Sequence, residues 1–312
     1  MPEKAYISEI QRFCVHDGAG IRTNVFFQGC PLRCKWCQNP ETISMSPLIQ
    51  YNQELCAGCG SCITRCDKQA ISVGGNGCPA TDKLICNLCG SCTKECYFLA
   101  RTMSSKVYTV DEIFELVMKD ETVYKNSGGG ITVSGGEPLL HKEFNTELLK
   151  RCKNAGISTA VETAGFVPFT TFEAVSPYTD TFLFDCKAYT EELHKTWVGR
   201  SNRLILENIT RLTQIHDNVV IRVPLIPGVN DSDEEFSKIV EFVGALRKIN
   251  SMHILPFHQY GAGKYTLIGR LYECHDLIED NDERIDRCKE IAEAKGIRVN
   301  VGGTGFADDR QV

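Results

Sequence analysis

The segment GCPLRCKWCQNP, residues 29–40, carries Cys30, Cys34 and Cys37 in the spacing C-x3-C-x2-C. It follows directly on the apolar run 24–27, which we predict to be a β-strand. Three thiolates this close in sequence can hold three corners of a [4Fe–4S] cubane. Because such a cluster normally takes four cysteines, one iron would stay open to a small molecule.

Two plainer interpretations of this segment remain open. Zinc also accepts thiolate and imidazole ligands, so the three cysteines could form a zinc site completed by Cys14 or His16. Trp36, just before the third cysteine, could simply pack the loop.

From Thr109 onward, helical patterns alternate with short apolar runs, which is typical of βα units around a parallel sheet. Two helix starts carry a capping-box pattern, Thr109 with Glu112 and Ser232 with Glu235. We therefore predict an α/β fold, a partial (β/α)6 TIM-like barrel of six or seven strands, with ligands at the C-terminal strand ends. The strand candidates are residues 24–27, 131–134, 158–162, 182–186, 219–224, 253–257 and 298–301.

Residues 48–103 differ from the rest of the chain in composition. They hold two similar blocks of four cysteines and few large apolar residues, so we interpret them as a small insert after the first strand that needs metal to fold. The chain then divides into residues 1–47, with the first barrel strand and the three-cysteine loop, the insert 48–103, and residues 104–312, the remainder of the barrel.

Both blocks have the spacing C-x2-C-x2-C-x3-C of bacterial two-cluster ferredoxins, in which each fourth cysteine serves the other cluster. A zinc ribbon would instead show two pairs of C-x2-C. We expect a ferredoxin-like insert with two clusters, and hence three [4Fe–4S] clusters in the chain. The spacing alone does not fix which cluster Cys66 and Cys96 join. The expected ligand sets are Cys56, Cys59, Cys62 and Cys96 for one cluster and Cys66, Cys86, Cys89 and Cys92 for the other.

The overall composition disfavours several classes of protein. A net charge of -6 and the lack of a long Lys/Arg run argue against binding to nucleic acid. Residues 1–10 mix charged with apolar residues and offer neither a secretory segment nor a membrane span, so we expect a cytoplasmic protein without membrane partners. In a reducing compartment, seventeen cysteines favour metal ligation over disulfides.

Polar motifs stand at the ends of the later strand candidates. Glycines permit close backbone approach, a carboxylate complements a cation, and charged groups at the end of a buried strand need a partner. The alternatives are an ordinary turn at 134–138, an exposed ion pair between Asp185 and Lys187, and a bridge between strands formed by Arg222. The motifs are Ser134-Gly135-Gly136-Glu137-Pro138, Glu162-Thr163-Ala164-Gly165-Phe166, Asp185-Cys186-Lys187, Arg222 and His258.

Together these motifs resemble the radical S-adenosylmethionine (SAM) superfamily, and within it the activating enzymes of glycyl radical enzymes, over nearly the whole chain. FCVHDGAG, residues 13–20, resembles their DGPG element, with Ala19 replacing the proline, and Asp17 would help seat the partner's glycine loop. The resemblance implies that the open iron binds the amino and carboxylate groups of SAM, and that a monovalent cation lies near the acid and threonine of the third strand. The implied SAM contacts are Trp36, Cys37, Gln38, Gly135, Gly136, Glu137, Glu162, Thr163, Asp185, Cys186, Lys187, Arg222 and His258.

The resemblance also implies an activity. The cluster on Cys30, Cys34 and Cys37 would be the catalytic group: reductive cleavage of SAM gives a 5′-deoxyadenosyl radical, which abstracts hydrogen from a backbone glycine of a glycyl radical enzyme, with no acid or base side chain required. The insert implies a lyase or dehydratase partner of choline, glycerol, hydroxyproline or isethionate type, or an aryl decarboxylase or alkylsuccinate synthase. The electron donor would be a flavodoxin or ferredoxin in an anaerobic cell.

Two other functions stay open. One is a radical SAM enzyme that acts on another protein or on a small molecule. The other is a ferredoxin-like electron carrier, which would not need the motifs at the strand ends.

Overall fold

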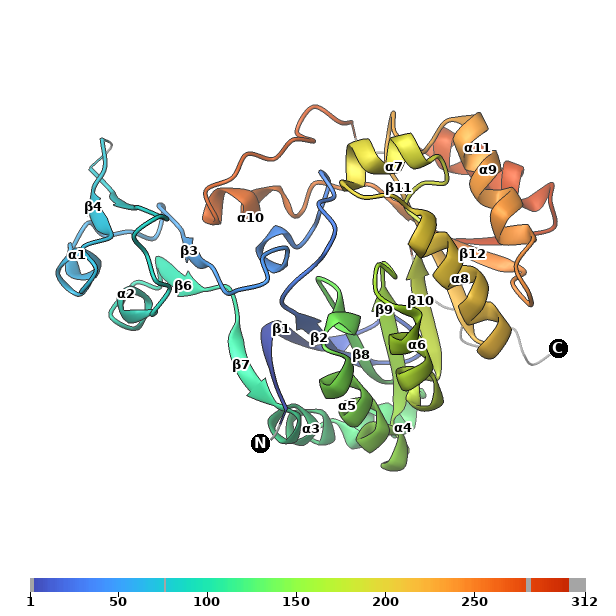
Figure 1. Cartoon of the computed structure of the whole chain (residues 1–312), viewed down its shortest axis with the longest axis horizontal. Coiled ribbons are helices and arrows are strands. Elements are labelled where there is room, and N and C mark those ends of the chain that lie inside the picture. Colours follow the sequence, from blue (N-terminus) through green and yellow to red (C-terminus); the bar gives the residue numbers. More distant parts are fainter. Residues whose placement is uncertain (1–2, 76, 279–281, 303–312) are drawn as a thin grey trace.

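A nine-stranded sheet in the order β13-β12-β11-β10-β9-β8-β2-β1-β7 forms the main body of the computed structural model, which describes residues 3–75, 77–278 and 282–302 (Figure 1). The seven strand candidates are all present, with ends within two residues of those expected, and they run parallel. They are β2 (Arg22–Phe27), β8 (Gly130–Gly135), β9 (Ser158–Thr163), β10 (Thr181–Asp185), β11 (Val219–Leu225), β12 (Ser251–Pro256) and β13 (Arg298–Val301).

Two antiparallel strands were not predicted. β1 (Lys4–Cys14) pairs with β2 on one side and with β7 (Lys106–Thr109) on the other. Ala5 and Ile7 of β1 are buried, as expected where alternate residues of a strand face the core. The strand expected to come first, residues 24–27, is therefore the second strand of the chain, β2, and residues 48–103 follow it as expected.

Helices follow most of the parallel strands and cover the sheet, and neighbouring helices such as α3, α5 and α6 pack on one another (Figure 1). Among the described residues, no helix is long and apolar enough to cross a membrane. The helices of this region are α3 (Val110–Met118), α4 (Glu121–Ser127), α5 (Lys142–Asn154), α6 (Phe169–Val175), α7 (Glu191–Val198), α8 (Arg203–Ile215), α9 (Asp233–Gly244), α10 (Ala262–Leu267) and α11 (Asp282–Glu293), with 3-10 turns η1 (Pro40–Thr42), η2 (Pro138–Leu140) and η3 (Ser176–Tyr178).

One of the two expected capping boxes is complete. The Thr109 hydroxyl accepts from the Glu112 N–H, and the Glu112 carboxylate accepts from the Thr109 N–H at 2.7 Å. At α9, Ser232 caps the Glu235 N–H, but the Glu235 carboxylate accepts from the Tyr189 N–H instead of returning to its own cap. The second box is therefore only half correct, because Glu235 ties α9 to the loop after β10.

The insert is a small unit with an internal repeat, and it projects from the left side of the sheet in Figure 1. β3 pairs with β6 and β4 with β5, both antiparallel. The repeat extends to the backbone, because Gly60 and Gly90 begin the two short helices at φ 73° and 76°, and Gln69 and Leu99 share φ near +52°. The elements are β3 (Ile49–Tyr51), α1 (Ser61–Thr64), β4 (Ile71–Val73), β5 (Pro79–Thr81), α2 (Ser91–Lys94) and β6 (Arg101–Met103).

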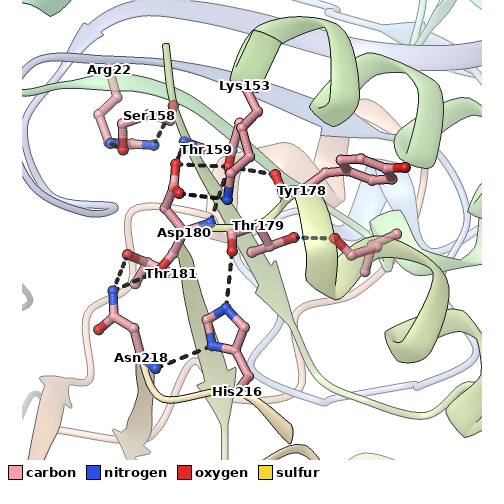
Figure 2. Close-up of polar contacts among 11 residues, drawn as sticks. Arg22, Lys153, Ser158, Thr159, Tyr178, Thr179, Asp180, Thr181, His216 and Asn218 are labelled. Atoms are coloured by element: carbon pink, nitrogen blue, oxygen red, sulfur yellow. Dashed lines mark hydrogen bonds and ion pairs between the residues drawn. The ribbon is translucent and has the colours of Figure 1, made fainter. Parts of the chain in front are cut away.

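A polar network fixes the starts of β9, β10 and β11, at the strand ends opposite the motifs (Figure 2). The Asp180 carboxylate accepts from the Thr159 N–H at 2.9 Å and from the Lys153 ammonium group at 3.0 Å. The Asn218 amide donates to the Asp180 carbonyl, and His216 bonds the Thr179 carbonyl. Burial acts to raise the pKa of Asp180, but the Thr159 N–H and Lys153 lower it below its ordinary value.

We expect Asp180→Ala to reduce the free energy of unfolding by about 1 to 2 kcal/mol, because it removes a charge-assisted acceptor shared by two strands. Urea denaturation measures this, and Asp217→Ala, which removes a surface pair with Lys248, should change the midpoint little. A carboxylate with a lowered folded-state pKa stabilises the fold above its unfolded pKa of about 3.9. The difference between variant and parent should therefore shrink as the pH falls below that value, and a difference unchanged by pH would contradict the assignment.

Candidate functional site

A cavity of ≈ 280 Å³ lies at the C-terminal ends of the parallel strands, where the fold predicts it. It gathers residues from the cysteine loop and from five strands or the loops that follow them. Cys14 and His16, the alternative zinc ligands, do not line it. Of the residues expected at the site, it is lined by Cys30, Cys34, Trp36, Cys37, Gln38, Gly135, Gly136, Glu162, Thr163, Asp185, Lys187, Arg222 and His258.

Backbone contacts with η1 and with α7 hold the cysteine loop. The Gly29 N–H donates to the Thr42 carbonyl at 2.7 Å, and the Lys35 N–H donates to the Trp197 carbonyl at 3.0 Å. Trp36 packs against Trp197 with the ring centroids 6.3 Å apart, and only 5% of Trp36 is exposed. Trp36 thus packs the loop and lines the cavity at the same time.

The three cysteines of this loop are partly buried and line the same cavity. Burial raises the pKa of Cys37 to about 12, and the neighbouring Cys34 thiol adds to the effect. Within the described ranges, no three Cys, His, Asp or Glu side chains gather closely enough for a single metal ion. A cubane binds its thiolates through separate irons, so its ligands stand further apart than those of one ion.

Gln38 joins the cysteine loop to the segment after β12. Its amide donates to the His258 carbonyl at 2.9 Å, and its side-chain oxygen accepts from the Gly261 N–H at 2.8 Å. Its position therefore closes one side of the cavity and sets the distance between His258 and the thiols.

The two glycines after β8 allow that strand to meet the cysteine loop. The Gly136 N–H donates to the Phe27 carbonyl at 2.8 Å, and a Cβ at Gly136 would stand 2.2 Å from the Gly29 carbonyl oxygen. Gly135 has φ +109°, a conformation that favours glycine. The turn is therefore closely fitted to the segment that begins the cysteine loop.

Glu137 differs from its expected position, because its side chain lies outside the cavity lining and is fully buried. Its carboxylate accepts from the Thr163 hydroxyl at 2.7 Å and from the N–H groups of Leu139, Ala164 and Gly165 at 3.0 to 3.1 Å. Burial raises its pKa to about 7, against the effect of these four donors. Glu137 therefore ties the β8 turn to the β9 turn, and its predicted contact with SAM stays a prediction.

Cys186 also differs from expectation. Its side chain is 1% exposed and belongs to the hydrophobic core instead of the cavity lining. The side chains of successive strand residues alternate, so the direction that aims Asp185 and Lys187 at the cavity turns Cys186 away from it. The predicted contact of Cys186 with SAM stays a prediction, and its side chain packs in the core.

One wall of the cavity is built of charged side chains around Arg222. The guanidinium lies 3.1 Å from Glu162, 3.2 Å from Asp17 and 3.8 Å from Asp185. Arg222 therefore bridges strands, the alternative weighed from the sequence, and it also lines the cavity. Lys187 pairs with Asp185 at 2.7 Å, but both side chains are largely buried, so this is not the exposed pair that the sequence allowed.

The electrostatics of this wall favour a cation in the cavity. Burial raises the pKa of Glu162 to about 7, while Arg222 and the Ser134 hydroxyl, which donates at 2.6 Å, act to lower it. With its three carboxylates ionised against two cations, the wall has one negative charge in excess. A positively charged ligand would stabilise Glu162 in its ionised form.

Two contributors to this wall were not assigned to the SAM site from the sequence. Asp17 reaches Arg222 from the FCVHDGAG segment, and the Asn24 amide holds its other oxygen. Ser134 positions Glu162. The DGAG pattern signalled Asp17, but only the folded chain brings it to Arg222, 205 residues away.

In the insert, a second and smaller cavity is lined by Cys56, Cys59, Cys62 and Cys96. Cys96 belongs to the other block of the sequence, so the fold brings the fourth cysteine of one block to the first three of the other. Cys62 and Cys92, the third cysteines of the blocks, pack in one buried cluster with Ile71. This arrangement matches the first expected ligand set.

Comparisons with known proteins agree with the geometry. Residues 24–243 match the family model of the Radical SAM superfamily. The 4-hydroxyphenylacetate decarboxylase activating enzyme of Clostridioides difficile (strain 630) is 39% identical over 303 residues, 95% of each chain. The indoleacetate decarboxylase activating enzyme of Tractidigestivibacter scatoligenes is 37% identical, covering 95% of this chain and 96% of its own. The trans-4-hydroxy-L-proline dehydratase activating enzyme of Clostridioides difficile is 37% identical, with 95% and 99% covered.

The fold and the three-cysteine cavity thus define a radical SAM protein, and the chain belongs to that superfamily. Its relatives over almost the full length place it among the activating enzymes of glycyl radical enzymes. Membership implies a [4Fe–4S] cluster and SAM, and the residues fit both, because three thiols share one cavity with the acidic side chains of Glu162 and Asp185.

We expect Gly136→Ala to weaken SAM binding at least about tenfold, because the added methyl group must displace the β8 turn from the Gly29 carbonyl. Equilibrium dialysis of the reconstituted protein measures this. Gly263→Ala on α10, where a Cβ meets nothing within 4 Å, is the matched control. Equal affinities for the two variants would show that the position of the β8 turn does not determine SAM binding.

Proposed function

We propose that this chain activates a partner glycyl radical enzyme by cleaving SAM reductively at the cluster on Cys30, Cys34 and Cys37. The observation that carries the proposal is one cavity that three thiols line together with the charged side chains of Glu162, Asp185, Lys187 and Arg222. When bound, the cluster supplies an electron and an open iron. No side chain of the cavity needs to transfer a proton.

The residues of the cavity bind and orient the cofactor. SAM carries a sulfonium and an ammonium group against one carboxylate, so its net positive charge complements the wall around Arg222. Lys187, at the cavity wall, is suited to the carboxylate of SAM. Trp36 offers a flat apolar face to the adenine, and Gln38 holds the His258 segment against it. Glu162 and Thr163 are suited to a monovalent cation beside SAM.

The barrel assignment extends this proposal. We take β2 and β8 to β12 as the six strands of a partial (β/α)6 barrel, residues 1–47 and 104–312. The cavity gathers residues from the ends of these strands, and β1 and β7 extend the sheet on the β2 side.

We take residues 48–103 as a ferredoxin-like insert with two further [4Fe–4S] clusters. The cavity lined by Cys56, Cys59, Cys62 and Cys96 supports the first ligand set, and the internal repeat supports the second, Cys66, Cys86, Cys89 and Cys92. The insert would carry electrons from a flavodoxin or ferredoxin toward the barrel cluster. A simple electron carrier would not need the charged cavity.

The partner is proposed as a class. Relatives at 37 to 39% identity serve decarboxylases, a dehydratase and a lyase, so identity supports a glycyl radical enzyme of a small substrate without choosing among these types. The partner's glycine would enter the cavity as an extended loop, which requires opening on both sides.

Anaerobic reconstitution should load about twelve irons per chain and, with dithionite and SAM, yield 5′-deoxyadenosine. Changing Cys30, Cys34 and Cys37 to Ala should remove about four irons and all SAM cleavage, because the barrel cluster is lost. Iron analysis measures the iron content, and chromatography of the nucleoside measures SAM cleavage. Cys14→Ala is the control and should retain the iron content and the cleavage activity. Zinc in place of iron, or cleavage that survives in the triple variant, would overturn the proposal.

Glu162→Gln should weaken SAM binding about tenfold, which corresponds to about 1.4 kcal/mol, because it cancels the excess negative charge of the cavity wall. Isothermal titration of the reconstituted protein gives the affinity, and iron content checks that the cluster is intact. Glu207→Gln, at an exposed pair on α8, should leave the affinity unchanged. An unchanged affinity in Glu162→Gln would show that the charge of the cavity wall does not contribute to SAM binding.

A further inference from the structure

Arg101, the first residue of β6, is a buried cation at the centre of the insert. Only 2% of it is exposed, and its guanidinium lies over the Tyr51 ring at 4.8 Å. One Nη donates to the Thr81 hydroxyl at 2.7 Å and the other to the Pro79 carbonyl at 2.9 Å. β5 therefore holds the guanidinium in a fixed orientation.

The charge of Arg101 meets the Tyr51 ring and the Cys62 and Cys92 thiols, but no carboxylate of the described residues. Its Nε–H is buried without a hydrogen bond, and among the described residues no carboxylate forms an ion pair with it. A buried charge without a counter-ion is costly, and so is a buried donor without an acceptor. A site that retains such a group is expected to bind something negatively charged at that point.

The neighbours of Arg101 identify the negatively charged group that it would meet. It lines the cavity of Cys56, Cys59, Cys62 and Cys96, and it also lines a separate cavity that contains Cys86 of the other block. Its charge acts on the Cys62 and Cys92 thiols, where burial raises the pKa and the guanidinium opposes it. Arg101 therefore lies between the two expected cluster sites and touches the surroundings of both.

The internal repeat of the insert shows that this cation is not required by the fold. Ile71 occupies the corresponding place, as the first residue of β4 and two residues after the left-handed Gln69, just as Arg101 follows Leu99. Ile71 is also buried, at 4% exposed, and it packs against Cys62 and Cys92. An apolar side chain thus fills this position in one half of the repeat, and a charged one fills it in the other.

We propose that Arg101 is a redox-tuning residue shared by the two clusters of the insert, with its Nε–H directed at cluster sulfur and its charge stabilising their reduced state. This inference rests on the proposed clusters of the insert. Each cluster takes up one electron from an external reductant, a flavodoxin or ferredoxin in the cell, and no bond forms or breaks. A nearby cation and hydrogen bonds to the sulfurs both raise a cluster's reduction potential. The raised potentials make the insert an electron acceptor from such donors.

The test uses the full chain with Cys30, Cys34 and Cys37 changed to Ala, so that only the insert clusters report. Potentials are measured by an anaerobic redox titration followed by electron paramagnetic resonance, with dithionite as reductant. Arg101→Gln removes the charge and keeps a polar side chain, whereas Arg101→Lys keeps the charge. Arg65→Gln is the control, because Arg65 is exposed and pairs with Glu95 beside the same blocks.

In Arg101→Gln we expect the ratio of reduced to oxidised cluster at a fixed potential to fall about tenfold, which is about 59 mV for a one-electron couple. Arg101→Lys should recover most of this loss, and Arg65→Gln should change nothing. If Arg101→Gln loses its iron while Arg101→Lys retains it, the cation is needed for the clusters to bind, which also supports the proposal.

Other results would overturn it. Arg101→Gln could retain about eight irons and show the same potentials as Arg65→Gln. This result would show that Arg101 does not tune the potentials, and it would still support the proposed clusters. An equal fall in Arg101→Lys and Arg101→Gln would show that charge is not the cause. No iron in the parent with the three Ala substitutions would overturn the insert clusters and this inference together.

Discussion

The contact of Arg222 with three carboxylates is the constraint on which the cavity depends. Asp17, Glu162 and Asp185 come from the segment before β2, from β9 and from β10, and the guanidinium on β11 brings them together. A buried cation of this kind is stable only while its partners remain in place, and each carboxylate depends on it in turn. The ion pairs hold the strands together, and with its three carboxylates ionised the group still favours a cationic ligand. Packing and binding thus depend on the same atoms.

The protein supplies charges of opposite sign in the cavity and in the insert. In the cavity the protein supplies the negative charge, and the positive charge is that of the ligand. In the insert the protein supplies a cation, Arg101, that pairs with no carboxylate of the described residues, and thiolate clusters would supply the negative charge. Both arrangements leave a buried group incompletely paired in the protein alone, which is the expected property of sites built around a cofactor. Two separate parts of the structure therefore point to the same kind of chemistry.

Sequence reasoning succeeded where periodicity or spacing carries the information. Apolar runs located all seven parallel strands, and the cysteine spacing located residues that the fold brings together. It missed β1, where only Ala5 and Ile7 are buried and the other positions, which mix charged, polar and apolar residues, show no regular alternation. It also assigned Glu137 and Cys186 to the ligand by motif, whereas side-chain direction decides their surroundings. Asp17 and Arg222 meet only through tertiary structure, so no local pattern could have paired them.

The most direct test of the central claim asks whether the cavity delivers its radical to a glycine. The reduced, reconstituted protein is incubated anaerobically with SAM and a candidate glycyl radical enzyme produced with deuterated glycine, and the 5′-deoxyadenosine is examined by mass spectrometry. The account predicts deuterium in the 5′-deoxyadenosine together with a glycyl radical signal on the partner. Cleavage of SAM that leaves the nucleoside unlabelled with every glycyl radical enzyme tried would contradict it, and would point to a different target for the same chemistry.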